Sequence, residues 1–353
     1  MELSERKREI LKSVIDAYIL TGEPVGSKFV VSRLRKGCSS ATVRNEMSDL
    51  EEMGFLEHPH TSAGRVPTRR GYRMYVDSLM EEYRLGFEER ILLNSLLNEK
   101  ADDAFQMTGR MAKLLSKMTG YAVAVVTREK TGTIERFEGV FIHPGSFLLV
   151  MITSSGKAIT KQLTTDFPVD QEGIALLSER LNEHLAKKEL GGVTLERILA
   201  LEETLGEYRS LIAGILRVIY DVMAELGREQ VVVEGISNLL DYEEFTAFPG
   251  NKSLFAQLED REELPARLGL DAGYSMRVHI GSEKEGLEGA SFLTCPFRFG
   301  KKVQGAVCVI GPKRMNYAEA MARLEYLARK ISAVHGFESA LPMIENPETE
   351  MRE

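Results

Sequence analysis

Residues 39–54 read SSATVRNEMSDLEEMG, and residues 55–67 continue as FLEHPHTSAGRVP. The first stretch opens on two serines that can cap a helix, repeats apolar residues at helical spacing and ends at a glycine, so we expect a helix over 41–53. The second stretch begins as a short strand, turns through a polar loop and returns at Arg65. This order of elements predicts a winged helix.

Two upstream patterns predict the remaining helices of this N-terminal unit. Apolar residues recur at helical spacing from Ile10 to Ile19 behind Ser4, a suitable N-cap, and this helix should end at Thr21. The segment GEPVG at 22–26 forces a turn, after which Ser27 can cap a short helix over 28–34. Three short helices at this spacing are typical of a helix-turn-helix.

The third helix has two chemically different faces. Val43, Met47 and Leu50 fall on one side of the helical wheel and should form core. The opposite side has small and hydrogen-bonding residues that suit base edges in a major groove, where Asn matches adenine and Arg matches guanine. The alternative is a plain solvated face, which usually contains Glu and Lys. The predicted recognition residues are Ser40, Ala41, Thr42, Arg44, Asn45 and Ser48.

The wing loop is a second predicted contact with DNA, because hydroxyls, backbone N–H groups and Arg suit phosphate or a minor groove. His58 and His60 could instead form a metal pair, but no second cluster completes a ligand set, so we predict no metal site. Tyr72 and Tyr75 could contact nucleic acid, although packing at a hinge is the favoured interpretation. The predicted wing contacts are His60, Thr61, Ser62, Gly64, Arg65, Arg69 and Arg70.

Charge is distributed unevenly along the chain. The formal net charge is −8; residues 1–80 have 13 Lys and Arg against 11 Asp and Glu, a net +2, which leaves −10 for residues 81–353. Ser27–Arg73 holds nine basic and five acidic residues. This local excess favours a polyanionic partner for the N-terminal unit, since the acidic remainder would repel one.

Composition excludes several protein classes. The 353 residues, 43% hydrophobic and 28% charged, are enough for two or three folded domains. The longest apolar runs are far shorter than the roughly 20 residues that span a bilayer, and the first residues lack the apolar core of a signal peptide. Three widely spaced cysteines indicate a reducing compartment. We therefore expect a cytoplasmic protein with no membrane segment.

The rest of the chain predicts an α+β architecture in which an antiparallel sheet domain is split by a helical insertion. Helical spacing at 88–97 and 104–118 precedes four β-rich runs at 121–127, 133–142, 147–153 and 157–164. Helices follow at 171–188 and 194–226, and strands resume near 231, 274–281, 290–296 and 302–310. A last helix over 317–334 should pack one face on the core, with a dimer contact as the alternative.

Motifs for catalysis or cofactor binding are missing from the sequence, which has no P-loop, no dinucleotide fingerprint, no zinc-protease motif and no nucleophile elbow. The segments GSE at 281–283 and GPKRM at 311–315 are unusual turns that could border a pocket but are better interpreted as structural. Cys295 and Cys308 lie in apolar strands, as inert core cysteines do. We predict no enzyme activity, no catalytic residues and no cofactor.

Several short blocks stand out when they are taken together in their order along the chain. They are GEPVGSK at 22–28, SSATVRN at 39–45, PHTSAGRVPT at 59–68, GYR at 71–73, EGISNLL at 234–240 and VIGPKRMNY at 309–317. Together these blocks resemble the heat-inducible transcription repressor HrcA family of bacteria. The likeness extends from near residue 3 to about residue 335 and is weakest between residues 81 and 230. A ten-residue wing segment with several ordered blocks is much more specific than one short motif.

The resemblance implies a repressor of heat-shock chaperone genes that binds the inverted-repeat operator CIRCE as a homodimer, is released on heat stress and depends on the GroEL chaperonin. It also implies a GAF-like domain interrupted by an inserted dimerisation domain. Combined with the patterns above, this predicts 1–82 as a winged-helix DNA-binding domain, 83–118 as a helical linker, 119–165 with 230–340 as the GAF-like domain, 166–229 as the inserted dimerisation domain and 341–353 as a frayed acidic tail. Two other interpretations stay open. The sheet domain could sense a metabolite, since GAF-like folds often hold small ligands, or the chain could be an enzyme.

Overall fold

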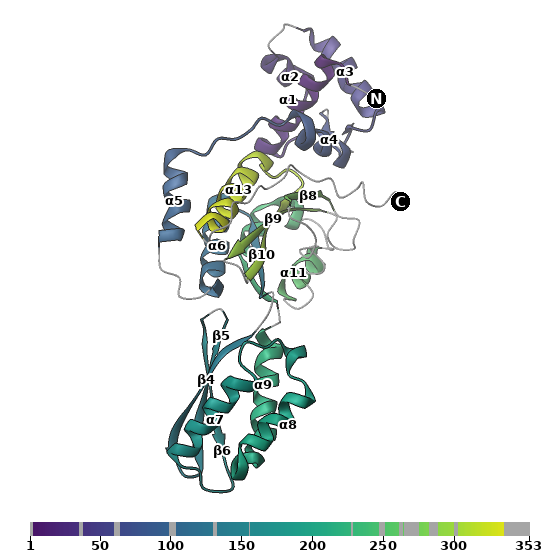
Figure 1. Cartoon of the computed structure of the whole chain (residues 1–353). Helices are drawn as coiled ribbons and strands as arrows, with labels where there is room; N and C mark the ends of the chain where they lie inside the picture. Colours follow the sequence, from purple (N-terminus) through teal and green to yellow (C-terminus); the bar gives the residue numbers. More distant parts are fainter. Residues whose placement is uncertain are drawn as a thin grey trace.

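The computed structural model describes three units stacked along one long axis (Figure 1). It describes residues 3–34, 38–59, 64–98, 104–129, 133–154, 156–226, 229–246, 251–260, 264, 275–281, 289–299 and 303–334. We call residues 3–80 the head, residues 134–226 the insert, and the remaining described residues the body. In Figure 1 the head and the insert lie at opposite ends of the body.

The head has the predicted winged-helix order of α1 (Glu5–Thr21), α2 (Ser27–Arg33), α3 (Ser40–Glu52), β1 (Leu56–Glu57), β2 (Val66–Pro67) and α4 (Arg69–Met74). Ser4 caps α1 and Gly22 ends it in the left-handed conformation, as expected. The predicted cap of α2 was wrong: Gly26 is the N-cap and makes no side-chain bond. Ser27 is the first helical residue, and its hydroxyl instead bonds to the hydroxyl of Ser40 at 2.9 Å.

The chain leaves the head through a short π-helix, η1 (Tyr75–Leu79), followed by α5 (Phe87–Asn98) and α6 (Ala104–Thr119). Tyr72 and Tyr75 are buried, so the prediction that they pack at the hinge is confirmed. The hydroxyl of Tyr75 donates to Asp16 of α1 at 2.7 Å, which fixes the exit path against the first helix.

The body is built on a five-stranded antiparallel sheet in the order β7-β3-β10-β9-β8, from β3 (Ala122–Glu129), β7 (Gln230–Glu234), β8 (Arg277–Ile280), β9 (Ala290–Phe299) and β10 (Val303–Pro312). Alternate residues of β3 point to opposite faces: Val123 and Val125 pack toward α6 and α13 (Tyr317–Val334), and Ala122 and Ala124 pack toward the other side. That side is covered by η4 (Ile236–Asp241), α10 (Glu243–Thr246) and α11 (Asn251–Glu259). The last helix is a core helix, as expected.

The expected division of the body after residue 165 was wrong. The strands β4 (Ile134–His143), β5 (Ser146–Thr153) and β6 (Ala158–Thr164) form a separate antiparallel sheet, β4-β5-β6, instead of joining β3. Their buried side chains belong to the same core as those of α7 (Gln171–His184), α8 (Leu195–Thr204), η3 (Gly206–Leu211) and α9 (Ile212–Leu226), and η2 (Leu190–Gly192) lies between α7 and α8 in the chain. The insert therefore begins after β3, and an ion pair between Arg128 and Glu229 joins the points where the chain leaves and returns.

Three further observations concern the described residues. None of their helices is long and apolar enough to cross a membrane. Within the same ranges, no cluster of His, Cys, Asp or Glu has the arrangement of a metal site. Burial raises the pKa of the Cys295 and Cys308 thiols to about 12, whereas Cys38 is half-buried.

These burial differences predict selective alkylation. A thiol with a pKa near 12 is about 0.01% thiolate at pH 8, and the thiolate is the reactive species. We expect iodoacetamide at pH 8 to modify Cys38 of the folded protein and to leave Cys295 and Cys308 intact until urea unfolds the body. Peptide mass spectrometry measures the three sites separately; equal rates at all three in the folded protein would contradict the buried positions.

Candidate nucleic-acid interface

The first turn of α3 is held in place by hydroxyl groups. Ser39 accepts a hydrogen bond from the Thr42 backbone N–H at 3.0 Å, and its hydroxyl lies 2.9 Å from that of Thr42. The bond between Ser27 and Ser40 joins α2 to the same turn. The predicted recognition hydroxyl of Ser40 therefore also joins α2 to α3, and that of Thr42 contacts the N-cap of its own helix; the sequence pattern showed neither role.

The predicted recognition face of α3 lies at the surface. Ala41, Arg44 and Asn45 are exposed. Thr42 and Ser48 are partly exposed, whereas Val43, Met47 and Leu50 of the opposite face are buried in the head. A helix that buries one side and presents Arg and Asn near its N-terminal end has the chemistry that the edges of bases require.

Three of the four acids of α3, Glu46, Asp49 and Glu51, have cationic partners within the head, whereas Glu52 is exposed. Lys7 of α1 binds Glu46 at 2.6 Å and Asp49 at 2.7 Å, and the hydrogen bonds that its ammonium donates to Asp49 and Glu46 raise the pKa of Lys7. Arg65 of the wing binds Glu51 at 2.7 Å. Carboxylates that already have cationic partners repel phosphate less, so the exposed charge beside the first turn of α3 is that of Arg44.

The wing is anchored at its root by backbone contacts. Val25 and Arg65 exchange two backbone hydrogen bonds of 2.9 and 3.0 Å. Gly64 is buried, and a Cβ at this position would lie 2.6 Å from the carbonyl carbon of Pro24. The structure thus gives Gly64 a packing role under the wing, because only glycine permits that approach. The predicted contacts His60, Thr61 and Ser62 lie outside the described residues.

The three predicted wing arginines differ in their surroundings. Arg65 is held by Glu51, and Arg70 donates to the Met53 carbonyl at 2.9 Å while its guanidinium lies 4.6 Å from the centre of the Phe55 ring. Arg69 is exposed. Arg65 and Arg70 therefore brace the junction of α3 with the wing, and the sequence could not reveal this, because their partners are set by the tertiary fold.

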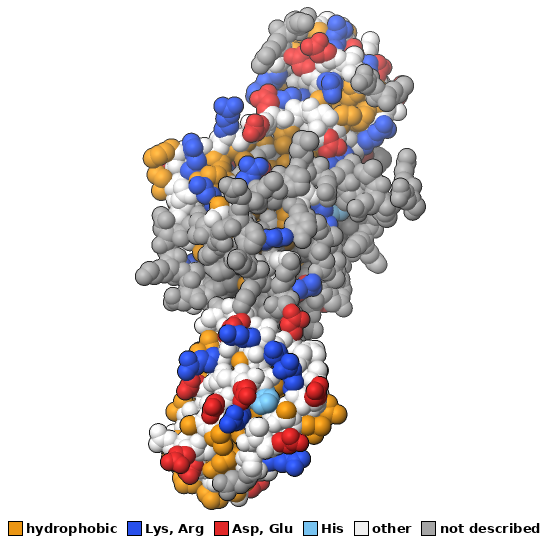
Figure 2. Space-filling view, viewed as in Figure 1, with side chains coloured by type: hydrophobic (Ala, Val, Ile, Leu, Met, Phe, Trp, Pro, Cys, Tyr) orange, Lys and Arg blue, Asp and Glu red, His pale blue; other side chains and the backbone are white. Residues whose placement is uncertain are grey.

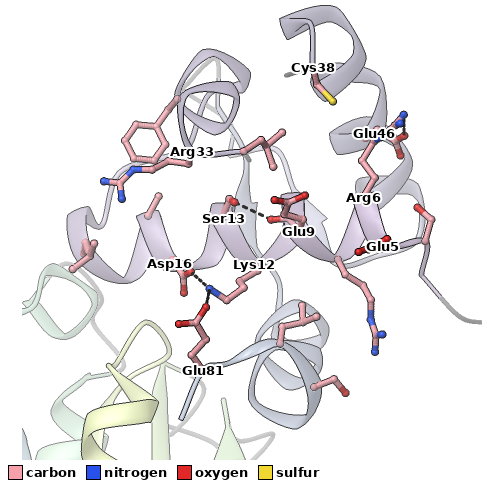
Figure 3. Close-up of a pocket in the computed structure, with 18 residues that line it drawn as sticks. Glu5, Arg6, Glu9, Lys12, Ser13, Asp16, Arg33, Cys38, Glu46 and Glu81 are labelled. Atoms are coloured by element: carbon pink, nitrogen blue, oxygen red, sulfur yellow. Dashed lines mark hydrogen bonds and ion pairs between the residues drawn. The ribbon is translucent and has the colours of Figure 1, made fainter. Parts of the chain in front are cut away.

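An open hollow runs along α1 on the head (Figure 3). Its polar lining is mixed in sign and largely self-paired: Lys12 binds Asp16 at 3.0 Å and Glu81 of the exit segment at 3.2 Å. Figure 3 shows Arg6, Glu9 and Arg33 along the same rim. A lining that alternates acids and bases selects neither anions nor cations, so this hollow is no alternative site for the phosphate backbone.

Comparison with known proteins agrees with this geometry. Residues 2–79 match the family model "Winged helix-turn-helix transcription repressor, HrcA DNA-binding", and residues 106–321 match "HrcA protein C terminal domain". A solved structure described as a hypothetical protein at 2.2 Å resolution superposes with a TM-score of 0.66 at 24% identity, over 96% of this chain and 100% of that one, which shows a common fold.

Curated relatives match over nearly the whole chain. The heat-inducible transcription repressor HrcA of Acetivibrio thermocellus is 34% identical over 94% of this chain and 96% of its own length. The proteins of the same name from Moorella thermoacetica and Clostridioides difficile are 33% and 32% identical over 94% of this chain, and over 98% and 99% of their own lengths. A transcription repressor has a non-enzymatic role, in agreement with the prediction for this chain. The match in both segments places the chain in the HrcA family of heat-inducible transcription repressors.

Proposed function

We propose that the chain is a sequence-specific transcriptional repressor that binds DNA through the exposed face of α3. The observation that supports this most directly is the exposure of Arg44 and Asn45 on a helix in which three of the four acids are paired within the head. Figure 2 shows Lys and Arg side chains on the head at one end of the molecule. In this proposal Ser40, Ala41, Thr42, Arg44, Asn45 and Ser48 meet the major groove, and the wing with Arg69 lies on the flanking backbone.

We further propose that the insert joins two copies of the chain. One face of its sheet packs on α7 and α9, and the register places the other apolar side chains together on the opposite face. Val140 lies opposite Leu148, and Val150 and Ile152 continue the row, each partly or fully exposed. Figure 2 shows hydrophobic side chains on the surface of this unit. An uncovered apolar sheet face is the kind of surface that a second copy covers.

A two-fold dimer explains an inverted-repeat operator. Two α3 helices related by a two-fold axis face two half-sites of opposite orientation, spaced by about one helical turn of DNA or a multiple of it. Together with the family membership, this geometry supports a cytoplasmic repressor whose target is the CIRCE operator upstream of chaperone genes. The proposal also includes a GAF-like body, release on heating and recovery of the active form by the GroEL chaperonin.

The recognition face predicts that substitutions there lower the affinity for DNA by an amount that depends on the DNA sequence. Asn45→Ala should weaken binding to the operator by about 1 to 3 kcal/mol, because a bidentate contact with adenine is lost, and should change binding to a scrambled duplex little. Arg44→Ala should relax the choice of base in the same way. Arg69→Ala is the matched control: it should weaken both duplexes alike and lower the salt slope by about one. Fluorescence anisotropy at several salt concentrations measures all three; equal losses on both duplexes for Asn45→Ala would contradict base contact.

The open sheet face predicts the oligomeric state. Val150→Lys places a charge in the apolar row and should convert the dimer to a monomer, whereas Glu179→Lys on the exposed side of α7 should leave the dimer intact. Sedimentation velocity measures the masses. The Val150 variant should still bind a single half-site, since the head is unchanged, but lose the added affinity of the full operator. A dimer that survives this substitution would move the interface elsewhere.

The chaperonin dependence predicts recovery after heating. If a small free-energy difference separates the binding-competent form from the other forms, heating lowers the population of the binding-competent form and a chaperonin restores that population. We expect GroEL with ATP to raise the operator-bound fraction of previously heated protein several-fold, with ATP alone as the control. Gel-shift titration measures this fraction; no gain with chaperonin would remove this part of the proposal.

A further inference from the structure

The turn GPKRM at 311–315 places one of its side chains between the body and the head. The turn follows β10 and is closed by a bond from the Met315 N–H to the Pro312 carbonyl at 2.9 Å. Arg314 extends from it, and its guanidinium donates to both carboxylate oxygens of Glu244 on α10, at 2.5 and 3.3 Å. The same group lies 5.3 Å from the centre of the Tyr242 ring. The body therefore holds this guanidinium on two sides.

The third side of the guanidinium faces the end of α1 in the head. A Cβ at Gly22 would lie 3.2 Å from the Arg314 Cζ, so the side chain packs directly on the C-cap of the helix. The last turn of α1 has no basic residue of its own. The C-terminal end of a helix has a partial negative charge that a cation stabilises, and Arg314 supplies that cation from another unit. We call Arg314 with Glu244 the latch.

Two further contacts join the head to the body beside the latch. Arg73 of α4 donates to the Val278 carbonyl of β8 at 2.7 Å, and Asp77 holds the rest of its guanidinium. The rings of Tyr72 and Tyr317 lie 6.3 Å apart at a tilted angle. These contacts cross between α4 and the far end of the sequence, so the angle of the head is fixed by long-range packing.

The interface also contains an unsatisfied group. Tyr72 is 1% exposed, and its hydroxyl finds no hydrogen-bond partner among the described residues. A buried hydroxyl without a partner opposes the state that buries it, because water would satisfy it if the interface opened. This one hydroxyl therefore favours an opened interface, and the latch opposes it together with the Arg73–Val278 bond and the apolar core that the head shares with the body.

We propose that Arg314 and Glu244 are positioning residues that set the distance between half-sites that the dimer accepts. The inference rests on the proposed function. A head locked to the body presents α3 at one distance from the two-fold axis, whereas a head released from the latch samples a range of distances. The latch then determines operator specificity without touching a base.

The first test compares spacings on the full-length chain. Duplexes with the half-site spacing changed by two or five base pairs, and a duplex with a single half-site, are titrated with the wild type, R314Q and E244Q. The wild type should discriminate strongly between spacings. R314Q and E244Q should lose this discrimination by about tenfold while single half-site affinity stays within twofold. R329Q, which breaks an exposed pair with Glu325 on α13, is the matched control and should behave like the wild type.

The second test measures the head without DNA. Spin labels at residues 52 and 179 of one chain, diluted with unlabelled chain and with Cys38 replaced by serine, report the distance between head and insert. R314Q should broaden the distance distribution. Y72F, which removes the unsatisfied hydroxyl, should narrow it and should preserve spacing discrimination to a higher temperature than the wild type. Because Y72F should stabilise the docked head instead of releasing it, this variant tests the proposal even if R314Q folds poorly.

Each outcome has a distinct meaning. A wild type that binds no half-site, with a distance distribution that R314Q broadens, rejects the proposed function and supports the latch as the element that fixes the head. A wild type that discriminates spacings, with R314Q and E244Q that discriminate equally well and keep a narrow distribution, overturns the latch. A Y72F variant that widens the distribution would also contradict it.

Discussion

The head and the body share one continuous apolar core, and the other features of the molecule depend on it. Buried residues of α1, α3 and α4 belong to the same cluster as those of α6, α13 and one face of the five-stranded sheet. A small winged helix alone would bury too little apolar surface for a large stability margin. Joined to the body, the head gains stability but loses independence. A loss of packing in the body can therefore reach α3, the proposed recognition helix, even though the body itself does not contact DNA in this proposal.

Local patterns in the sequence predicted the elements well, because burial repeats with the period of each element. Val43, Met47 and Leu50 were assigned to core from spacing alone and are buried, and the last helix has the expected bounds of 317–334. Caps were predictable where one side chain meets the next turn, as at Ser4 and Ser39. Family resemblance, and not periodicity, was needed to propose CIRCE, the dimer and the chaperonin.

What the sequence could not reveal is which distant groups meet. The run at 133–164 alternates like a strand region whichever sheet it joins, so the pattern alone could not tell which sheet that is. The hydrogen-bond pairing places these strands in a sheet of their own, and their assignment to the body was therefore wrong. Arg65 and Arg70 looked like phosphate contacts, and their partners, Glu51 and the Met53 carbonyl, come from the folded head. Arg314 lies in an unusual turn that we interpreted as structural from the sequence, and its contact with Gly22 joins positions almost three hundred residues apart.

In the proposed dimer, a rigid docking of the head also changes how two weak contacts combine on DNA. On a flexible tether the second head has an effective concentration near millimolar over a wide range of half-site spacings. A docked head has a high effective concentration at only one half-site spacing, so the affinity for an operator with that spacing is higher and the affinity for operators with other spacings is lower. In the proposed mechanism, release on heating then needs no unfolding of the winged helix. Loosening the interface around Tyr72 and Arg314 would spread the heads of the proposed dimer over many distances, so that each half-site contact survives while their cooperation is lost.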